Sequence, residues 1–454
     1  MSLRCCLLVL GSLFAAPLIG RAQEPAGQPP AALDSAAQGP TAAGRLGEEV
    51  EGLIGQLIAD SAAERADARA RLLELAGPGP KRGERVLELL PEPDELMPPA
   101  LRTQLNDLRL EIEKRIAKTA IGESRVTLDV ADATLAKVLS AITLETDNKL
   151  LDNRGQFGQQ VVDRAITLKL TDRPFWEAVD RVLDQAELDV YAYSGEDALA
   201  LVNRDDGRAP RSGAASYAGP FRIAANSITA TRNLTRPDQK SMNVELEIAW
   251  EPRLRPIALT QRLDQVVATN ENGERLELTG REQIDLELSF GNQATELRLP
   301  FALPPRDTTT IATLRGTLEV LAPGREAEFR FEDLKAGRES VTKRVGGVTV
   351  TLAGVQKNGA VWEVHMRLRL DQPGEALASH RGWVFDNETY LLDADGKKID
   401  HAGFETTLQT HEEIGLAYLF DHEPGVEGLT WVYHTPSSVH RFPVDYELKD
   451  LKLP

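Results

Sequence analysis

Hydrophobic residues between positions 45 and 120 recur every three or four residues, which is the spacing of one face of an α-helix. The clearest run is Val50, Leu53, Ile54, Leu57 and Ile58. A later stripe of the same kind is Leu101, Leu105, Leu108, Ile112 and Ile116. We therefore expect an α-helical module over residues 45–120.

Short motifs mark where these helices begin and end. Ser61-Ala-Ala-Glu64 is a capping box, in which hydroxyl and carboxylate satisfy two free backbone N–H groups. Gly77-Pro78 ends the second helix, a third covers about 82–90, and a fourth begins at Pro98-Pro99. The two helical hairpins resemble a pair of HEAT-like repeats. A four-helix cap on the next domain is the alternative, because two repeats are too few for a free-standing solenoid.

Residues 124–204 are predicted to form a small α+β domain in the order strand, helix, strand, strand, helix, strand, strand. The second helix follows Asp172-Arg-Pro174, because proline is tolerated in a first helical turn. Each helix carries an apolar stripe that we expect to face the core. The stripes are Leu135, Val138, Leu139 and Ile142 in the first helix, and Phe175, Ala178, Val179, Val182, Leu183 and Ala186 in the second.

This element order, with the run Val-Thr-Leu-Asp-Val-Ala-Asp-Ala-Thr-Leu-Ala-Lys-Val-Leu-Ser-Ala-Ile at 126–142 and Ile-Thr-Leu-Lys-Leu-Thr-Asp-Arg-Pro-Phe-Trp-Glu-Ala-Val-Asp at 166–180, resembles the short N-terminal domain of secretins and TonB-dependent receptors. The resemblance covers about 80 of the 454 residues. It implies an α+β plug or signalling domain that docks onto other periplasmic proteins. Neither a secretin pore domain nor an outer-membrane barrel follows, so only docking carries over.

After a polar linker at 205–218, hydrophobic and polar residues alternate, as at 244–250 and 284–290. Alternation of this kind is typical of strands with one buried and one solvated face. We expect two β-sandwiches, at residues 219–340 and 345–454. The predicted fold class is therefore multidomain α+β, with helical hairpins, a small α+β domain and two C-terminal β-sandwiches.

The two β regions have similar lengths and endings. Phe329-Arg-Phe331-Glu-Asp-Leu-Lys335 near the end of the first is similar to Val444-Asp-Tyr446-Glu-Leu-Lys-Asp-Leu-Lys452 at the end of the second. Tandem duplication and independent sandwiches with convergent strand patterns both explain this similarity.

The N-terminus is typical of an export signal. Arg4 precedes a short apolar run from Cys5 to Ile19, and Gly20-Arg21-Ala22 offers small residues for cleavage near Ala22. Residues 23–44 are rich in Ala, Pro, Gly and Gln and predict a disordered linker. Both cysteines would leave with the signal, which excludes disulfides and thiolate chemistry from the mature chain. No later apolar stretch reaches 18 residues, so we expect a periplasmic or secreted protein without a membrane span.

The charge balance argues against nucleic-acid partners. The chain has 52 Lys and Arg against 70 Asp and Glu, a formal net charge of −18. Affinity for a phosphate backbone comes largely from clustered cations, which this composition does not favour.

All seven histidines lie in the last 90 residues, and such clustering suggests a metal site because imidazole binds zinc and copper. They are His365, His380, His401, His411, His422, His434 and His440. Their spacings contain no His-x-His and no His-Glu-x-x-His motif, so we predict no metal site and no cofactor. If a metal were present, the ligands to mutate first would be His401, His411, His422 and His434.

Three other motifs suggest chemistry but are better explained locally. Asp393-Ala-Asp395-Gly396 is similar to part of a calcium loop, yet lysines follow it and a hairpin turn is favoured. Ser340-Val-Thr-Lys343 has the Ser-x-x-Lys spacing of serine acyl enzymes but none of their partner motifs. Gly155-Gln-Phe-Gly158 has the form of a KH-domain loop, in a region with nine Lys and Arg against fourteen Asp and Glu.

The five tryptophans raise the possibility of sugar stacking. They are Trp176, Trp250, Trp362, Trp383 and Trp431. Trp250 continues the apolar alternation that begins at Val244 and is expected in a core. Trp362 interrupts the alternation around it, which leaves its face undecided.

These observations predict an exported, non-catalytic multidomain adaptor that docks periplasmic or cell-envelope proteins. A carbohydrate- or cell-surface-binding protein that uses sandwich aromatics is the alternative, and a hydrolase with an unrecognised site comes third. No catalytic, cofactor or metal residue is assigned. The partner and the oligomeric state are left open.

Overall fold

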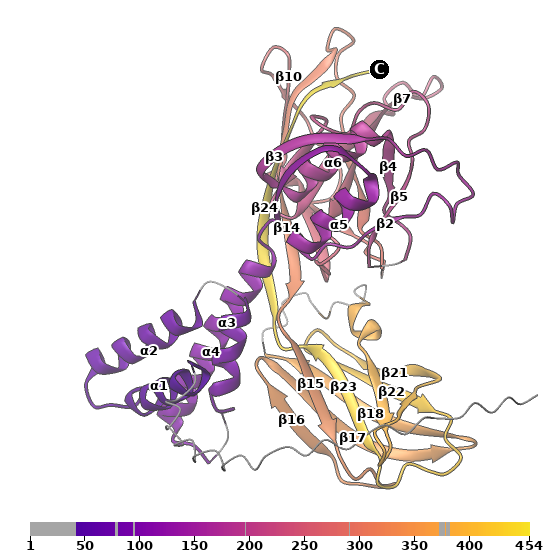
Figure 1. The fold of residues 1–454 in the computed structure, drawn as a ribbon. Helices are drawn as coiled ribbons and strands as arrows, with labels where there is room; N and C mark the ends of the chain where they lie inside the picture. The colour runs from indigo at the N-terminus through magenta and orange to yellow at the C-terminus, as the bar shows by residue number, and fades with distance from the viewer. Residues whose placement is uncertain are drawn as a thin grey trace, which may run out of the picture. The chain divides into compact units, whose positions relative to one another are not determined.

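The computed structural model describes residues 42–77, 80–93, 96–195, 197–289, 291–371, 377 and 382–454. The expected signal peptide at 1–22 and nearly all of the linker at 23–44 lie outside these residues. About 22% of the chain is helix and 43% is strand, in several sheets, with the strands concentrated toward the C-terminus. The protein is therefore α+β with a β-rich C-terminal part (Figure 1). In the described part of the chain, no helix is both long enough and apolar enough to cross a membrane.

Four helices form the N-terminal part, close to where the sequence places them. They are α1 (Ala42–Gln56), α2 (Ala62–Ala76), α3 (Pro80–Leu89) and α4 (Pro99–Ala120). Ser61 caps α2 by accepting a hydrogen bond from the Glu64 backbone N–H, at 3.4 Å, and Gly77 ends the helix with a φ of 62°. The α4 stripe faces inward, because Leu105, Leu108 and Ile112 are fully buried. The first stripe is only partly buried: Val50 and Leu57 are buried, but Ile58 lies beyond the end of α1 and is 43% exposed, because the helix stops at Gln56. Local capping and periodicity thus determine these helices.

The α+β region, called the module below, follows the expected element order. Its elements are β1 (Arg125–Ala133), α5 (Leu135–Thr146), β2 (Leu150–Asp152), β3 (Ile166–Pro174), α6 (Phe175–Ala186), β4 (Leu188–Tyr191) and β5 (Leu199–Asn203). Strands β1 and β3 pair antiparallel, and a second sheet has the order β2-β5-β4. All ten predicted stripe residues of α5 and α6 are buried in one core. Pro174 is the N-cap of α6.

Two sheets pack around one core in the first β-rich region, called the first sheet pair. One sheet has the order β13-β8-β7-β6, and the other has β11-β10-β14-β9-β12 with β24 paired to β14. The strands are β6 (Ala215–Ala218), β7 (Phe221–Arg232), β8 (Lys240–Trp250), β9 (Ala258–Arg262), β10 (Val267–Asn270), β11 (Arg275–Leu276), β12 (Gln283–Leu286), β13 (Ala294–Phe301), β14 (Thr310–Pro323) and β24 (Val439–Lys452). A 3-10 turn, η1 (Leu263–Gln265), follows β9. Alternate residues of β8 face the core, as the alternation predicted.

A second sheet pair packs around a separate core. Its sheets have the orders β15-β23-β19-β20 and β16-β17-β18-β22-β21. The strands are β15 (Glu326–Phe331), β16 (Val341–Val345), β17 (Val348–Asn358), β18 (Val361–Leu370), β19 (Thr389–Leu392), β20 (Lys398–Asp400), β21 (Gly403–Gln409), β22 (Glu413–Phe420) and β23 (Thr430–Pro436). A 3-10 turn, η2 (Trp383–Asp386), precedes β19.

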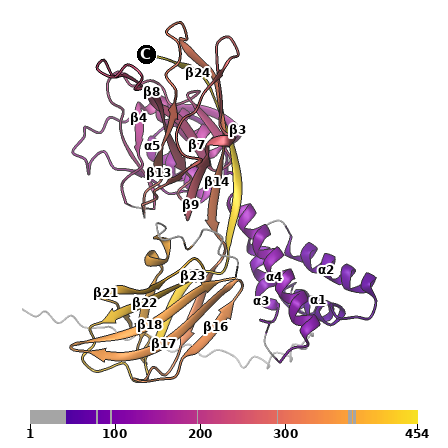
Figure 2. The ribbon, with the colours of Figure 1, turned by 180° about the vertical axis from the view of Figure 1, so that it is seen from behind.

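A continuous two-stranded ribbon connects the two sheet pairs. Thr310 pairs with Lys452 at one end and Phe331 pairs with Trp431 at the other, and the register does not slip between them. At the crossover, Gly324 N–H donates to the Ser438 carbonyl and Ser437 N–H donates to the Arg325 carbonyl, both at 2.7 Å. Strands β14 and β24 run side by side in both views of the ribbon drawing (Figures 1 and 2).

This pairing differs from the sequential division expected at 219–340 and 345–454. The last strand, β24, completes the first sheet pair, whereas β15 belongs to the second. The two similar sequence endings therefore lie in different sheets. The physical reason is that Val444, Tyr446 and Leu448 bury their side chains in the first core, a long-range choice that alternation within one strand does not encode.

The stretch at 205–218 is more than a linker. It ends in β6, which pairs with β7. It also places Arg211 at 5% exposure, because two carboxylates receive its guanidinium.

Candidate functional site

An exposed aromatic patch lies on the module. We define the aromatic patch as Phe157, Tyr191 and Tyr193, whose exposed fractions are 49%, 41% and 39%. The ring centroids of Phe157 and Tyr191 are 5.3 Å apart, and those of Tyr191 and Tyr193 are 6.3 Å apart, both edge to face at 70°. Large aromatic surfaces left in solvent are typical of protein interaction sites.

A buried arginine shapes the loop that presents Phe157. Arg154 is 1% exposed and donates to both Asp152 carboxylate oxygens, at 2.8 and 2.7 Å. It also donates to the Val162 carbonyl at 2.9 Å, so one guanidinium joins the two arms of the loop. The hydrogen bond from Arg154 holds the pKa of Asp152 below its ordinary value. One buried guanidinium therefore holds the loop that carries Phe157 in place.

Carboxylates surround the other end of the patch. Partial burial, together with Glu247, Glu296 and Glu245, raises the pKa of the Tyr193 hydroxyl. Glu247 of β8 lies directly opposite Glu296 of β13 in the sheet register. Like charges opposite each other destabilise a strand pair. The aromatic patch thus has a negatively charged border.

The first of two buried polar networks fixes the module on the first sheet pair. Asp180 of α6 is fully buried and accepts from Arg211 Nε at 2.8 Å, Arg222 Nε at 2.7 Å and the Tyr217 hydroxyl at 2.9 Å. Arg211 also pairs with buried Asp189. Burial and the nearby Asp180 charge raise the pKa of Tyr217.

The second network is centred on Glu251, which follows β8 and is fully buried. Its carboxylate accepts from the Ser124 backbone N–H at 2.8 Å, the Ser124 hydroxyl at 2.5 Å, Asn148 Nδ2 at 2.9 Å and Arg253 Nε at 2.7 Å. Trp176 of α6 donates from its indole to the Pro220 carbonyl at 3.0 Å. The module and the first sheet pair are therefore joined by satisfied buried hydrogen bonds.

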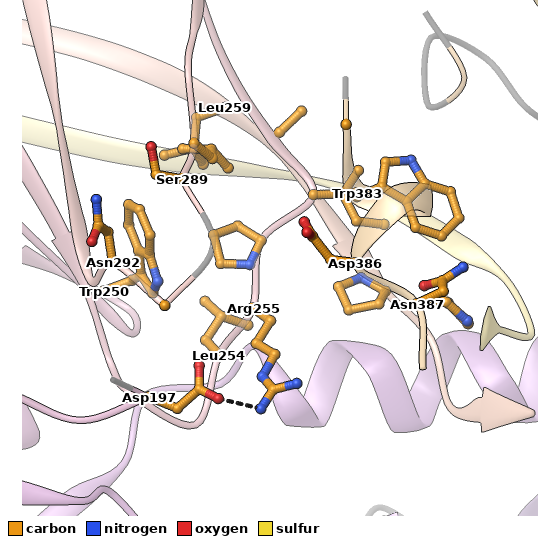
Figure 3. A pocket seen from close by; sticks show the side chains of 18 of the residues that line it. Asp197, Trp250, Leu254, Arg255, Leu259, Ser289, Asn292, Trp383, Asp386 and Asn387 are labelled. Atoms are coloured by element: carbon orange, nitrogen blue, oxygen red, sulfur yellow. Dashed lines mark hydrogen bonds and ion pairs between the residues drawn. The ribbon is translucent and has the colours of Figure 1, made fainter. Parts of the chain in front are cut away.

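A cavity of about 840 Å³ lies where the first and second sheet pairs meet (Figure 3). Its wall includes the loops after β8 and β12, parts of β9 and β12, the end of β14 with the start of β15, η2 and the end of β23. Trp250 and Trp383 stand on opposite sides of the space, and the Asp386 carboxylate lies between them (Figure 3). Arg255 pairs with Asp197 at 2.5 Å. The volume is in the range of small-molecule sites.

Two polar groups in this cavity are notable for their lack of partners. Burial raises the pKa of Asp386, and among the described residues its carboxylate has no hydrogen bond or ion pair. Gln293 is 2% exposed, and within the same part of the chain its amide oxygen accepts no hydrogen bond. Gln293 is thus a buried acceptor without a donor, which is rare and needs an explanation, whereas the Asp386 side chain is exposed and open to solvent.

The described histidines lie in the second sheet pair, apart from His440 at the start of β24. His365 bonds Glu363 at 2.8 Å, His401 lies against the Tyr418 ring, and His434 contacts Glu326 at 3.2 Å. His440 bonds the Ser438 hydroxyl at 2.9 Å. Within the described ranges, no group of three His, Cys, Asp or Glu could hold a metal ion. His380 lies outside the described residues.

Each of the three short sequence motifs lies in a turn or at a strand. Asp393 accepts from the backbone N–H groups of Asp395 and Lys397 in the turn between β19 and β20, as the hairpin interpretation predicts. Lys343 lies in β16, with exposed Ser340 just before that strand, and not on a helix. Gly155 and Gly158 form a turn after β2.

Four of the five tryptophans are buried. Trp250 lies in the first sheet-pair core, as predicted, and Trp362, whose face the sequence left open, is 7% exposed in the second. Trp176 and Trp431 are also buried, which leaves Trp383 half-buried at the cavity.

Sequence reasoning did not single out the aromatic patch or the cavity. Strand alternation gives no reliable signal for the patch, because Asp189 has the same parity as Tyr191 but is 2% exposed, and Tyr193 lies beyond the end of β4. Comparison with protein-family models, with curated proteins and with solved structures finds no match to this chain.

Proposed function

We propose that the protein is an exported, non-catalytic adaptor that docks a cell-envelope protein through the aromatic patch of residues 124–204. In this proposal the module is a docking domain of the secretin N-terminal kind, and the two sheet pairs are β-sandwiches that carry it. The observation that carries the proposal is the cluster of Phe157, Tyr191 and Tyr193, which are between 39% and 49% exposed.

The chemistry of the patch specifies its partner. Aromatic side chains bury large apolar areas with few rotatable bonds, and therefore act as anchors in protein interfaces. Glu245, Glu247 and Glu296 supply negative charge beside Tyr193. The partner is therefore a protein segment with apolar side chains flanked by Lys or Arg, since cations also bind aromatic faces.

The support behind the patch favours a permanent rather than an incidental surface. Arg154 holds the loop of Phe157, and Asp180 and Glu251 attach the module to the first sheet pair. A pre-ordered surface on a fixed domain loses little entropy when it binds.

Photo-crosslinking in cells that naturally carry the protein tests this proposal. A benzophenone amino acid at Phe157 or at Tyr193 is expected to capture the same envelope protein. The matched control position is Leu234, which is 88% exposed in the turn between β7 and β8 and lies outside the module. Equal crosslinking from Leu234, or none from Phe157 and Tyr193, would overturn the proposal.

Carbohydrate binding is the second candidate, and Trp383 is the observation that favours it. Its half-buried ring lines a cavity that also contains Asn292, Asn387 and Gln293. The burial of the other four tryptophans places this function second, because stacking on sugar requires an open ring face. Soluble oligosaccharides that bind the purified chain and quench Trp383 fluorescence would move it to first place.

A further inference from the structure

The cavity between the sheet pairs is rich in acceptors. Asp197, Asp285, Glu287, Glu326, Asp386 and Glu388 line it, against Arg255 and His434. Four of the six carboxylates already have partners: Asp197 bonds Arg255, Glu326 bonds His434, Glu388 bonds Lys398, and Asp285 accepts from the Thr260 hydroxyl.

Asp386 differs from these carboxylates. Within the described residues it has no partner, and it projects into the space between Trp250 and Trp383 (Figure 3). Gln293 contributes a second acceptor to the same wall, because its buried amide oxygen accepts no hydrogen bond from the described part of the chain. The Gln293 oxygen is buried without a donor, and the exposed Asp386 carboxylate is accessible to a cation that enters the cavity.

We propose that this cavity binds an organic cation, namely an ammonium or guanidinium group on an apolar stem. The cation would pair with Asp386 and lie against the indole of Trp383, since tryptophan is the best aromatic partner for a cation. The apolar stem would follow Leu254 and Leu259, which line the same space. This site is separate from the aromatic patch and goes beyond the proposed docking function.

Two sources could supply this cation: a free amine, or a Lys or Arg side chain of another protein. Pentylamine serves as the probe for the first source, and the peptide Gly-Ala-Lys-Ala-Gly for the second. The same peptide with norleucine in place of lysine keeps the stem and lacks the charge, so it measures the apolar contribution alone.

Titration calorimetry with the purified full chain tests the site. Both cationic probes are expected to bind, and the norleucine peptide about tenfold more weakly than the lysine peptide. Asp386→Asn should lower the affinity of the chain for both cationic probes about tenfold. The matched control is Asp395→Asn, at an exposed position in the β19–β20 turn, and it should leave that affinity unchanged.

The two cationic probes distinguish the sources. Tighter binding of the peptide than of pentylamine assigns the site to a protein side chain, and equal binding assigns it to free amines. Glu287→Gln is a second variant at an exposed lining residue, with a smaller loss expected. Equal affinity for the lysine and norleucine peptides, or full affinity in Asp386→Asn, would overturn the proposal.

Discussion

The two junctions of the first sheet pair are built in opposite ways. Toward the module, buried charges are matched: Asp180 receives two arginines and a tyrosine, and Glu251 receives four hydrogen bonds. Toward the second sheet pair, the ribbon carries continuous backbone pairing while a cavity of about 840 Å³ beside it contains acceptors without donors.

This difference indicates what each junction does. A satisfied buried network fixes the geometry of the groups that it joins, because leaving any member unpaired is costly. A polar cavity of this size has the volume of a small-molecule site, and its wall contains a buried acceptor without a donor. In the functions proposed above, the first junction presents the aromatic patch and the second receives a ligand.

The largest expected effect comes from breaking the module junction. Asp180→Ala leaves the guanidinium groups of Arg211 and Arg222 buried without their shared carboxylate. Loss of one partner from a buried ion pair costs about 3–5 kcal/mol. Urea unfolding of the full chain is expected to show a loss of that size in the transition that includes the module. A loss below about 1 kcal/mol would mean that the network does not hold the junction.

A smaller effect, which depends on pH, is expected at the ribbon crossover. Burial, with Lys114 nearby, lowers the pKa of His440 from 6.5 to about 4. The unfolded chain takes up a proton below pH 6.5 while the folded chain keeps His440 neutral. Its contribution to stability is therefore present above pH 6.5 and lost as the pH falls toward 4, on the order of 2–3 kcal/mol.

His440→Gln tests this pH dependence. The free energy of unfolding of the variant is expected to fall less than that of the wild type between pH 6.5 and pH 4. Parallel pH curves for the two proteins would contradict the assignment to His440.

The smallest effect is expected at an exposed ion pair of the module. Asp129 and Lys169 are 2.9 Å apart, and their side chains are 73% and 76% exposed. Asp129→Ala should leave the free energy of unfolding essentially unchanged, because solvent screens the pair. Thermal melts of Asp129→Ala and Asp180→Ala, measured side by side, compare the two ion pairs. A much larger fall in melting temperature for Asp180→Ala would show that burial, and not charge pairing alone, makes the module junction strong.

Local sequence signals predicted the elements well. Val138 and Val182 lie on buried helical stripes because the three-to-four spacing places them on one face of their helices. Ser61 was recognised as a cap because its partner lies three residues away. These features depend only on neighbours along the chain.

The pairing of strands and the composition of the cavity were not predictable in this way. Tyr446 alternates as any strand residue would, and nothing near it in the sequence specifies Gly316 of β14 as its partner. The cavity combines residues from Asp197 to Pro436, which only the folded chain brings together. Arg211 looked like part of a polar linker because its partners Asp180 and Asp189 lie more than 20 residues away.

The most direct test of the account is the affinity of the full chain for the envelope protein captured through position 193. Wild-type protein and Leu234→Ala are expected to bind that protein equally, because Leu234 lies outside the aromatic patch. Tyr193→Ala should bind at least about tenfold more weakly at unchanged melting temperature, as loss of an aromatic anchor costs about 2 kcal/mol. Equal affinity of Tyr193→Ala and wild type would contradict docking through the aromatic patch.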